Sequence, residues 1–172
     1  EQVSGVPHTV PYTRCYHRVT TDPNVMAFCG QWVIDGARTE SSDEWLKGLG
    51  KAWAFRKAAQ VAMVGNKTTL SVVDGKLKIE LKSTFKSGAN ELVLDAPEPL
   101  DGEDEMYGPY KYTAKQDGDK LHVHFDRTKD GSTVDTNYEV IDDGKTLVIA
   151  KVLKDKDGNV VASHTAYRKK VE

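Results

Sequence analysis

The sequence predicts a mainly β protein: a ten-stranded antiparallel up-and-down β-barrel, or β-clam, capped by a short helix-turn-helix. The first observation is a series of turns at near-regular spacing in the C-terminal half: Asp117-Gly118, Asp130-Gly131, Asp143-Gly144 and Asp157-Gly158. Asp-Gly readily adopts the positive φ angles of a hairpin turn. The second is that short runs rich in Val, Ile, Leu, Thr and Tyr flank each pair, as expected of strands. Because consecutive hairpins leave sheet edges exposed, closure into a barrel is the favoured arrangement.

Composition narrows the possible partners. The chain has 172 residues, which suits one domain with a sizeable core, and a formal net charge of −2. Its hydrophobic content of 38% is a little low for an ordinary globular domain, as a barrel with a polar-lined interior or long polar turns would explain. There is no basic excess to attract nucleic acid or anionic lipid, and no apolar run approaches the ~18 residues of a membrane span. The charge balance therefore predicts no nucleic-acid partner, and the lack of a long apolar run predicts no stable membrane insertion. The interior of the predicted barrel is where we expect a small hydrophobic molecule as partner; we also expect no cofactor and a monomeric chain.

Three features favour an extracellular (secreted) protein. The chain starts at Glu1 rather than Met, which we interpret as a processed N-terminus, and Asn66-Lys67-Thr68 is a glycosylation sequon. Cys15 and Cys29 are the two cysteines, and a disulfide between them would stabilise the fold by about 3 kcal/mol. The alternative is a cytoplasmic protein with two reduced thiols.

The N-terminal part divides into an arm and the start of the barrel domain. Residues 1–27 contain three prolines and no sustained apolar period, so we expect an irregular arm ahead of a domain at 28–172. A first strand is predicted at 28–37, where Trp32 and Ile34 share one face. We expect Trp32 to lie in the core.

A helix-turn-helix is predicted next. Ser41-Ser42-Asp43 offers an N-cap, apolar residues follow at helical spacing, Gly50 interrupts them, and the pattern resumes over 53–61. Helices this short are unstable alone and must dock on the barrel. We expect Trp45 and Trp53 to pack this helical lid on the barrel rim.

Period-two alternation begins after Gly65 and predicts the remaining strands. They are expected near 70–73, 77–82, 84–86, 92–95, 110–116, 120–127, 133–141, 146–154 and 160–169. Pro97, Pro99 and acidic residues predict a polar loop over 96–109.

Alternation also predicts which side chains face inward. In 133–141, a charged face must be solvated, so the opposite face points into the barrel. The inward set is Val134, Thr136, Tyr138 and Val140. His122 and His124 lie opposite an apolar face of their own strand, so we expect solvated histidines and no metal site.

This order of elements resembles the intracellular lipid-binding proteins, which include the fatty-acid and retinoid carriers. Phe28-Cys29-Gly30-Gln31-Trp32 is similar to the family's opening Phe-x-Gly-x-Trp, and 45–57 is similar to its lid, including the Leu-Gly break and the Arg-Lys pair. Residues 81–86 and 164–169 resemble its Ser-Thr-Phe-Lys strand and its closing strand. The resemblance covers about 28–170 and implies a ten-stranded barrel around a ligand cavity, with two helices as the portal.

The resemblance also implies a departure at the ligand head. Fatty-acid carriers hold the ligand carboxylate with two inward arginines and a tyrosine. Here family parity places Val161, Ser163, Thr165 and Tyr167 inward, so one arginine position falls on Thr165 and the other near Tyr138. We therefore expect the cationic clamp to be missing. An uncompensated buried carboxylate is costly, which favours a neutral or weakly polar lipid, terpenoid or retinoid-like ligand.

The predicted function is carriage or storage of this ligand. The predicted ligand-binding residues are Tyr138, Thr165, Tyr167, Arg56, Thr136, Ser163 and Phe85. The hydroxyls of Tyr138, Thr165 and Tyr167 would orient a polar head. Core packing of the tyrosines and a solvated cation at Arg56 stay open as alternatives. So does a secreted, cofactor-independent oxidoreductase, a luciferase-like monooxygenase, with undetermined catalytic residues. An interaction protein that uses the N-terminal arm and the acidic loop is a third possibility.

Overall fold

The computed structural model describes residues 25–83, 87–118 and 120–171, and confirms the predicted fold class. Its helices are α1 (Val25–Phe28), α2 (Asp43–Gly48) and α3 (Trp53–Met63). Its strands are β1 (Gly30–Ile34), β2 (Lys67–Val73), β3 (Lys76–Lys82), β4 (Ser87–Val93), β5 (Leu100–Asp104), β6 (Gly108–Asp117), β7 (Lys120–Arg127), β8 (Thr133–Ile141), β9 (Thr146–Lys154) and β10 (Val160–Lys170).

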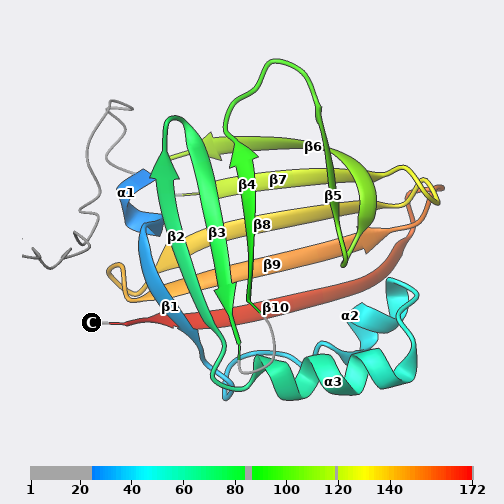
Figure 1. Cartoon of the computed structure of the whole chain (residues 1–172), viewed down its shortest axis with the longest axis horizontal. Coiled ribbons are helices and arrows are strands. Elements are labelled where there is room, and N and C mark those ends of the chain that lie inside the picture. The colour runs from blue at the N-terminus through cyan, green and yellow to red at the C-terminus, as the bar shows by residue number, and fades with distance from the viewer. Residues whose placement is uncertain (1–24, 84–86, 119, 172) are drawn as a thin grey trace, which may run out of the picture.

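One antiparallel ten-stranded sheet forms the whole framework, in the order β4-β3-β2-β1-β10-β9-β8-β7-β6-β5. Chain neighbours pair with each other, except at β4 and β5, and β1 joins β10. Figure 1 shows β1–β4 crossing in front of β6–β10, with α2 and α3 along one side of these two layers. The sheet is therefore a curled half-barrel whose edges are β4 and β5.

The turns between strands follow the predicted chemistry. Gly118, Gly131, Gly144 and Gly158 all have positive φ, from 58° to 85°. Asp74 adopts a φ of 51° ahead of Gly75, at 73°. Two successive residues with positive φ are typical of a type I′ hairpin turn. At the four predicted Asp-Gly turns the shared feature is the positive φ of the glycine, which glycine adopts without steric cost.

Two local predictions were wrong. The expected loop over 96–109 contains β5, which pairs with β6 from Leu100 opposite Tyr112 to Asp104 opposite Gly108. Acidic residues hid this strand, because an edge strand exposes much of its length and shows little alternation. The strand expected at 92–95 begins and ends earlier, as β4 over Ser87–Val93. The strand expected at 84–86 lies outside the described residues.

The core lies between the two layers. Trp32 is fully buried, as predicted, and its indole Nε1 donates a hydrogen bond to the Phe28 carbonyl at 3.0 Å. Leu70 from β2, Leu147 from β9 and Val123 from β7 are also buried to 2% exposure or less. The alternating positions of both layers thus converge on one apolar interior.

The lid helices are attached in different ways. Trp45 of α2 is buried, as predicted. Gly48 lies so close to β10 that an added Cβ would come within 3.0 Å of the Ala162 Cβ. In contrast, α3 has no buried residue, and Trp53 is 65% exposed. The prediction that Trp53 packs on the barrel rim was therefore wrong. Side-chain hydrogen bonds to Asp43, described below, connect α3 to α2 instead.

Candidate functional site

A row of polar side chains crosses the otherwise apolar interior face of β8, β9 and β10. Lys151 of β9 lies opposite Thr136 of β8 on one side and His164 of β10 on the other. Tyr138 follows two residues along β8, and Arg168 lies four residues beyond His164. Thr136, Tyr138, His164 and Arg168 are buried, and Lys151 is partly buried. We call these five residues the interior polar cluster.

The inward face of β10 is not the predicted one. His164, Ala166 and Arg168 are the buried residues, whereas Ser163 is exposed. Thr165 and Tyr167 therefore lie on the opposite face, and their inward assignment was wrong. The physical reason is a register irregularity between Val160 and Ala162, which removes Val161 from the alternation and moves every later side chain to the other face.

The outward residues of β10 contact the segment that follows β1. The Arg38 guanidinium stacks over the Tyr167 ring, 4.4 Å from its centroid. The Thr165 backbone N–H donates to the Glu40 carboxylate at 2.7 Å. These residues thus hold the connection between β1 and α2 against the sheet.

Arg168 supplies the positive charge that was expected to be missing. Its side chain is 7% exposed, and its Nη1 donates to the Asn66 Oδ1 at 3.5 Å. Burial lowers the pKa of Arg168 to about 10, partly offset by Tyr138, so the guanidinium remains protonated at neutral pH. Its Nε has no hydrogen-bond partner among the described residues.

Lys151 is a second basic side chain on this interior face. Its Nζ lies 5.9 Å from the centroid of the Trp45 ring, beneath α2. Burial lowers the pKa of Lys151, the charge of Arg168 lowers it further, and Tyr138 and Asp104 oppose this effect. None of the ion pairs between described residues involves Lys151. A neutral amine is thereby favoured more than at a surface lysine.

His164 and Tyr138 are neighbours of Lys151, and the surroundings of each determine its protonation state. Burial, followed by Lys151, lowers the pKa of His164. The His164 Nε2 lies 3.2 Å from the Glu40 carbonyl oxygen; because a carbonyl only accepts, Nε2 is the protonated nitrogen and Nδ1 is an acceptor. Burial raises the pKa of Tyr138, so this hydroxyl stays a proton donor at neutral pH.

Thr136 adds an unused hydroxyl to the interior polar cluster. It is 1% exposed, and its Oγ1 has no hydrogen-bond partner among the described residues. Because a buried unpaired polar group costs about 1–3 kcal/mol, both this hydroxyl and the Arg168 Nε would gain from a polar ligand group. The prediction that Thr136 and Tyr138 face inward is confirmed; their role in binding stays a prediction.

An aromatic wall lines the interior along β6 and β7. Tyr107, Tyr110, Tyr112 and Phe125 are all buried, and the Tyr110 and Phe125 rings meet edge to face at 5.1 Å. Burial raises the pKa of Tyr110 to about 12. The interior thus presents a polar side at β8–β10 and an aromatic side at β6–β7.

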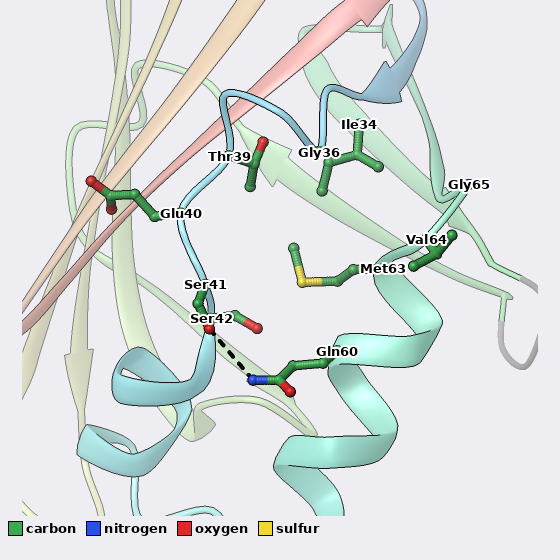
Figure 2. Close-up of a pocket in the computed structure, with 10 residues that line it drawn as sticks. All are labelled: Ile34, Gly36, Thr39, Glu40, Ser41, Ser42, Gln60, Met63, Val64 and Gly65. Carbon is green, nitrogen blue, oxygen red and sulfur yellow. Dashed lines mark hydrogen bonds between the residues drawn. The ribbon is translucent and has the colours of Figure 1, made fainter.

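A pocket of about 370 Å³ opens between the segment after β1 and the C-terminal half of α3. Figure 2 shows Thr39 and Ile34 on one side of it and Met63 on the other, with Gln60 reaching toward Ser41. Ile34 lies opposite Arg168 in the β1–β10 register. One residue that lines the pocket is therefore the cross-strand neighbour of Arg168.

Polar contacts of α3 border this pocket. The Asp43 Oδ1 accepts from the Arg56 Nε at 3.2 Å and from the Gln60 Nε2 at 3.3 Å. The Arg56 Nη1 donates to the Lys51 carbonyl at 3.3 Å. Arg56 is therefore engaged within the lid, and neither predicted alternative, a cavity residue or a solvated cation, describes it.

Several predicted sites fall elsewhere. Phe85 and Cys15 lie outside the described residues, so the disulfide to half-buried Cys29 stays a prediction. Asn66 is half-buried and contacts Arg168.

His122 and His124 of β7 face outward, as predicted. His124 Nδ1 lies 2.7 Å from the Asp135 Oδ1, and His122 is exposed. The described residues contain no group of three or more His, Cys, Asp and Glu placed to hold a metal ion. None of the described helices is long and apolar enough to cross a membrane.

Comparison with solved structures decides the fold. The Caenorhabditis elegans lipid binding protein 8 aligns with a TM-score of 0.71 and 16% identity, covering 85% of this chain and 96% of that one. The fold is that of the fatty-acid-binding proteins. The Echinococcus granulosus fatty-acid-binding protein 1 (TM-score 0.69, 18% identity, 86% and 99% coverage) agrees. So does a Schistosoma mansoni fatty acid binding protein in complex with arachidonic acid (0.68, 19%, 87% and 99%).

The resemblance predicted from the sequence is confirmed at the level of fold. No protein-family model and no curated protein sequence matches the chain. Fatty-acid-binding-protein neighbours this distant in sequence identify the architecture and leave the ligand to the residues of this chain.

Sequence reasoning did not place three members of the interior polar cluster on the inward face: Lys151, His164 and Arg168. One signal could have found the first. Within β9, Lys151 shares the parity of Leu147, Ile149 and Leu153, so alternation itself places this lysine on the apolar face.

Proposed function

We propose that this protein binds a hydrophobic ligand with a single acidic head, such as a long-chain fatty acid, between the layers of its sheet. The observation that carries the proposal is the interior polar cluster. A buried guanidinium, an amine and a hydroxyl that has no partner among the described residues share one otherwise apolar face of β8–β10.

A carboxylate fits these groups better than a neutral head. It accepts several hydrogen bonds at once, and its charge compensates that of Arg168. The Arg168 Nε has no hydrogen-bond partner among the described residues and could donate to a carboxylate oxygen, while the Thr136 hydroxyl, also without a partner there, is a second polar contact further along the same face. The preference for a neutral ligand depended on a missing cation, and Arg168 removes that premise.

The apolar remainder of the ligand would lie toward the aromatic wall. Burial of apolar surface contributes about 25 cal/mol per Å², so a long alkyl chain supplies most of the affinity and the head supplies orientation. The structural neighbours add support of a coarser kind, since one is a complex with arachidonic acid and another is a fatty acid transporter.

The ligand would reach the interior past α3. This helix has no buried residue, and the pocket beside it is lined by Ile34, the cross-strand neighbour of Arg168. A helix held by side-chain hydrogen bonds at Asp43 can move aside at less cost than a packed one.

Displacement of an environment-sensitive apolar dye tests the proposal. We expect a long-chain fatty acid to displace the dye at lower concentration than the alcohol of equal chain length. Equal potency of acid and alcohol would contradict the acidic head, and failure of both would contradict an interior ligand. Mass analysis of the recovered ligand also separates carriage from the oxidoreductase alternative, which requires a chemically altered product.

Secretion of the protein is a separate proposal, and it depends on a disulfide between Cys15 and Cys29 and on a glycan at Asn66. The contact between Asn66 and Arg168 competes with attachment of a glycan to that side chain. The intact mass of protein taken from its source would report a glycan and a disulfide together.

A further inference from the structure

We propose that Lys151 is an imine-forming lysine, and that hydrophobic aldehydes entering the interior become reversibly joined to its Nζ. This inference rests on the proposed interior site and adds a covalent ligand class to it. It starts from the position of the amine, which projects from an otherwise apolar β9 face beneath the buried Trp45.

The surroundings of Lys151 favour the nucleophilic form. An amine attacks a carbonyl only when it is unprotonated. Many surface lysines form ion pairs with carboxylates of the described residues, but Lys151 forms no such ion pair. The groups that face Lys151 include Arg168 and His164 from β10, Tyr138 from β8 and, more weakly, Asp104 at the end of β5.

The balance of these groups is toward the neutral amine. Burial is the largest effect and lowers the pKa of Lys151; Tyr138 opposes it, the charge of Arg168 lowers the pKa further, Asp104 opposes it weakly, and the net shift is downward. Each lowering of a lysine pKa by one raises the fraction of neutral amine at neutral pH about tenfold. An aldehyde in the interior thus meets an amine that is less protonated than those on the surface.

The neighbours can also move the protons that the reaction requires. The Nζ lone pair adds to the carbonyl carbon while the C=O π pair moves to oxygen, which takes a proton from the Tyr138 hydroxyl. The nitrogen gives up a proton to the Nδ1 acceptor of His164, which lies opposite Lys151 in the β9–β10 register. The resulting carbinolamine then loses its oxygen as water, leaving an imine, and both neighbours recover their starting protonation.

The net change is amine plus aldehyde to imine plus water, so no oxidant or reductant takes part. An aldehyde has the chain of the corresponding acid and a head that fits the same cluster. The apolar interior limits the water that would hydrolyse the imine. A reversible bond to a reactive aldehyde would withdraw it from other amines.

Trapping with a mild hydride reductant tests this inference on the full-length protein. The protein is incubated at neutral pH with one equivalent of dodecanal and cyanoborohydride, then measured by intact mass and peptide mapping. We expect one alkyl group per chain, located on Lys151, with clearly less label on every other lysine, because the amine of Lys151 is the less protonated one.

Lys151→Arg should lose the label, whereas Lys154→Arg, an outer-face variant on the same strand, should retain it. Peptide mapping of the unmodified sequence assigns the reacting lysine even if the first variant folds poorly. Dye displacement is measured in parallel. Displacement by dodecanal with no adduct, or with label scattered over surface lysines, would overturn the inference and leave the interior site intact; no displacement and no adduct would overturn both.

Discussion

Arg168 and Lys151 destabilise the protein without ligand, because burial removes water from their charged ends. The chain retains them on a face that Leu147, Ile149 and Ala166 otherwise make apolar. Buried basic residues that reduce stability and form no ion pair with the described carboxylates are typical of binding sites. Two substitutions separate their contributions.

Arg168→Met should weaken binding of a long-chain fatty acid by roughly 10- to 100-fold, since a charge-assisted hydrogen bond is worth about 1.5–3 kcal/mol. Binding of the matching fatty alcohol should change much less. Titration calorimetry measures both affinities. Arg38→Met, a change on the outer face beside Tyr167, serves as control. A similar loss for acid and alcohol would mean that Arg168 acts only through packing.

Lys151→Met should raise the free energy of unfolding of the ligand-free protein at neutral pH by about 1 kcal/mol or more, because a partly buried amine is replaced by an apolar side chain of similar length. The gain has a defined pH dependence. Burial lowers the pKa of Lys151 in the folded state, so the unfolded chain binds the extra proton and stability falls as pH falls below about 10.4.

The advantage of the Lys151→Met variant should therefore grow from pH 10 toward pH 7. Urea unfolding at several pH values measures it, with Lys154→Met as the outer-face comparison. A variant that is less stable than the parent at every pH would show that the lysine stabilises the folded state.

At the scale of elements, β10 and α3 explain where sequence reasoning succeeded and failed. Turn chemistry located the hairpins well because Asp-Gly dipeptides carry their conformation locally. The inward face of β10 depended instead on the irregularity at Val160–Ala162, which no composition signal marks. One unpaired residue reversed the face of Thr165 and Tyr167 and hid Arg168.

Asp43 controls the mobility of α3 in this account. Asp43→Ala removes the acceptor shared by Arg56 and Gln60, and α3 buries no side chain of its own. Amide hydrogen exchange over 53–63 should become faster, by about tenfold if 1.4 kcal/mol is lost, while exchange in β7–β9 stays unchanged.

Ligand association and dissociation should both accelerate in the same variant, and stopped-flow dye fluorescence follows these rates. Glu44→Ala, whose carboxylate contacts only Lys47 among the described residues, is the matched control. Unaltered exchange in α3 would show that Asp43 does not hold the helix.

At the scale of the whole molecule, the sequence was sufficient for the architecture and insufficient for the site. Hairpin spacing, the Gly-x-Trp strand and the helical break at Gly50 together predicted the curled ten-stranded sheet. The site depends on charged residues that normally face solvent. Arg168 and His164 could be placed inside only once the register of the closing strand with β1 and β9 was known.

The central claim is that an acidic lipid lies between the layers with its head at the interior polar cluster. A crystal structure with a long-chain fatty acid brominated at its far end tests this most directly. The account predicts a carboxylate within hydrogen-bond distance of the Arg168 Nε and anomalous bromine density near Tyr110 and Phe125. Bromine density on the outer surface of α3, or a ligand with its head turned away from Arg168, would contradict it.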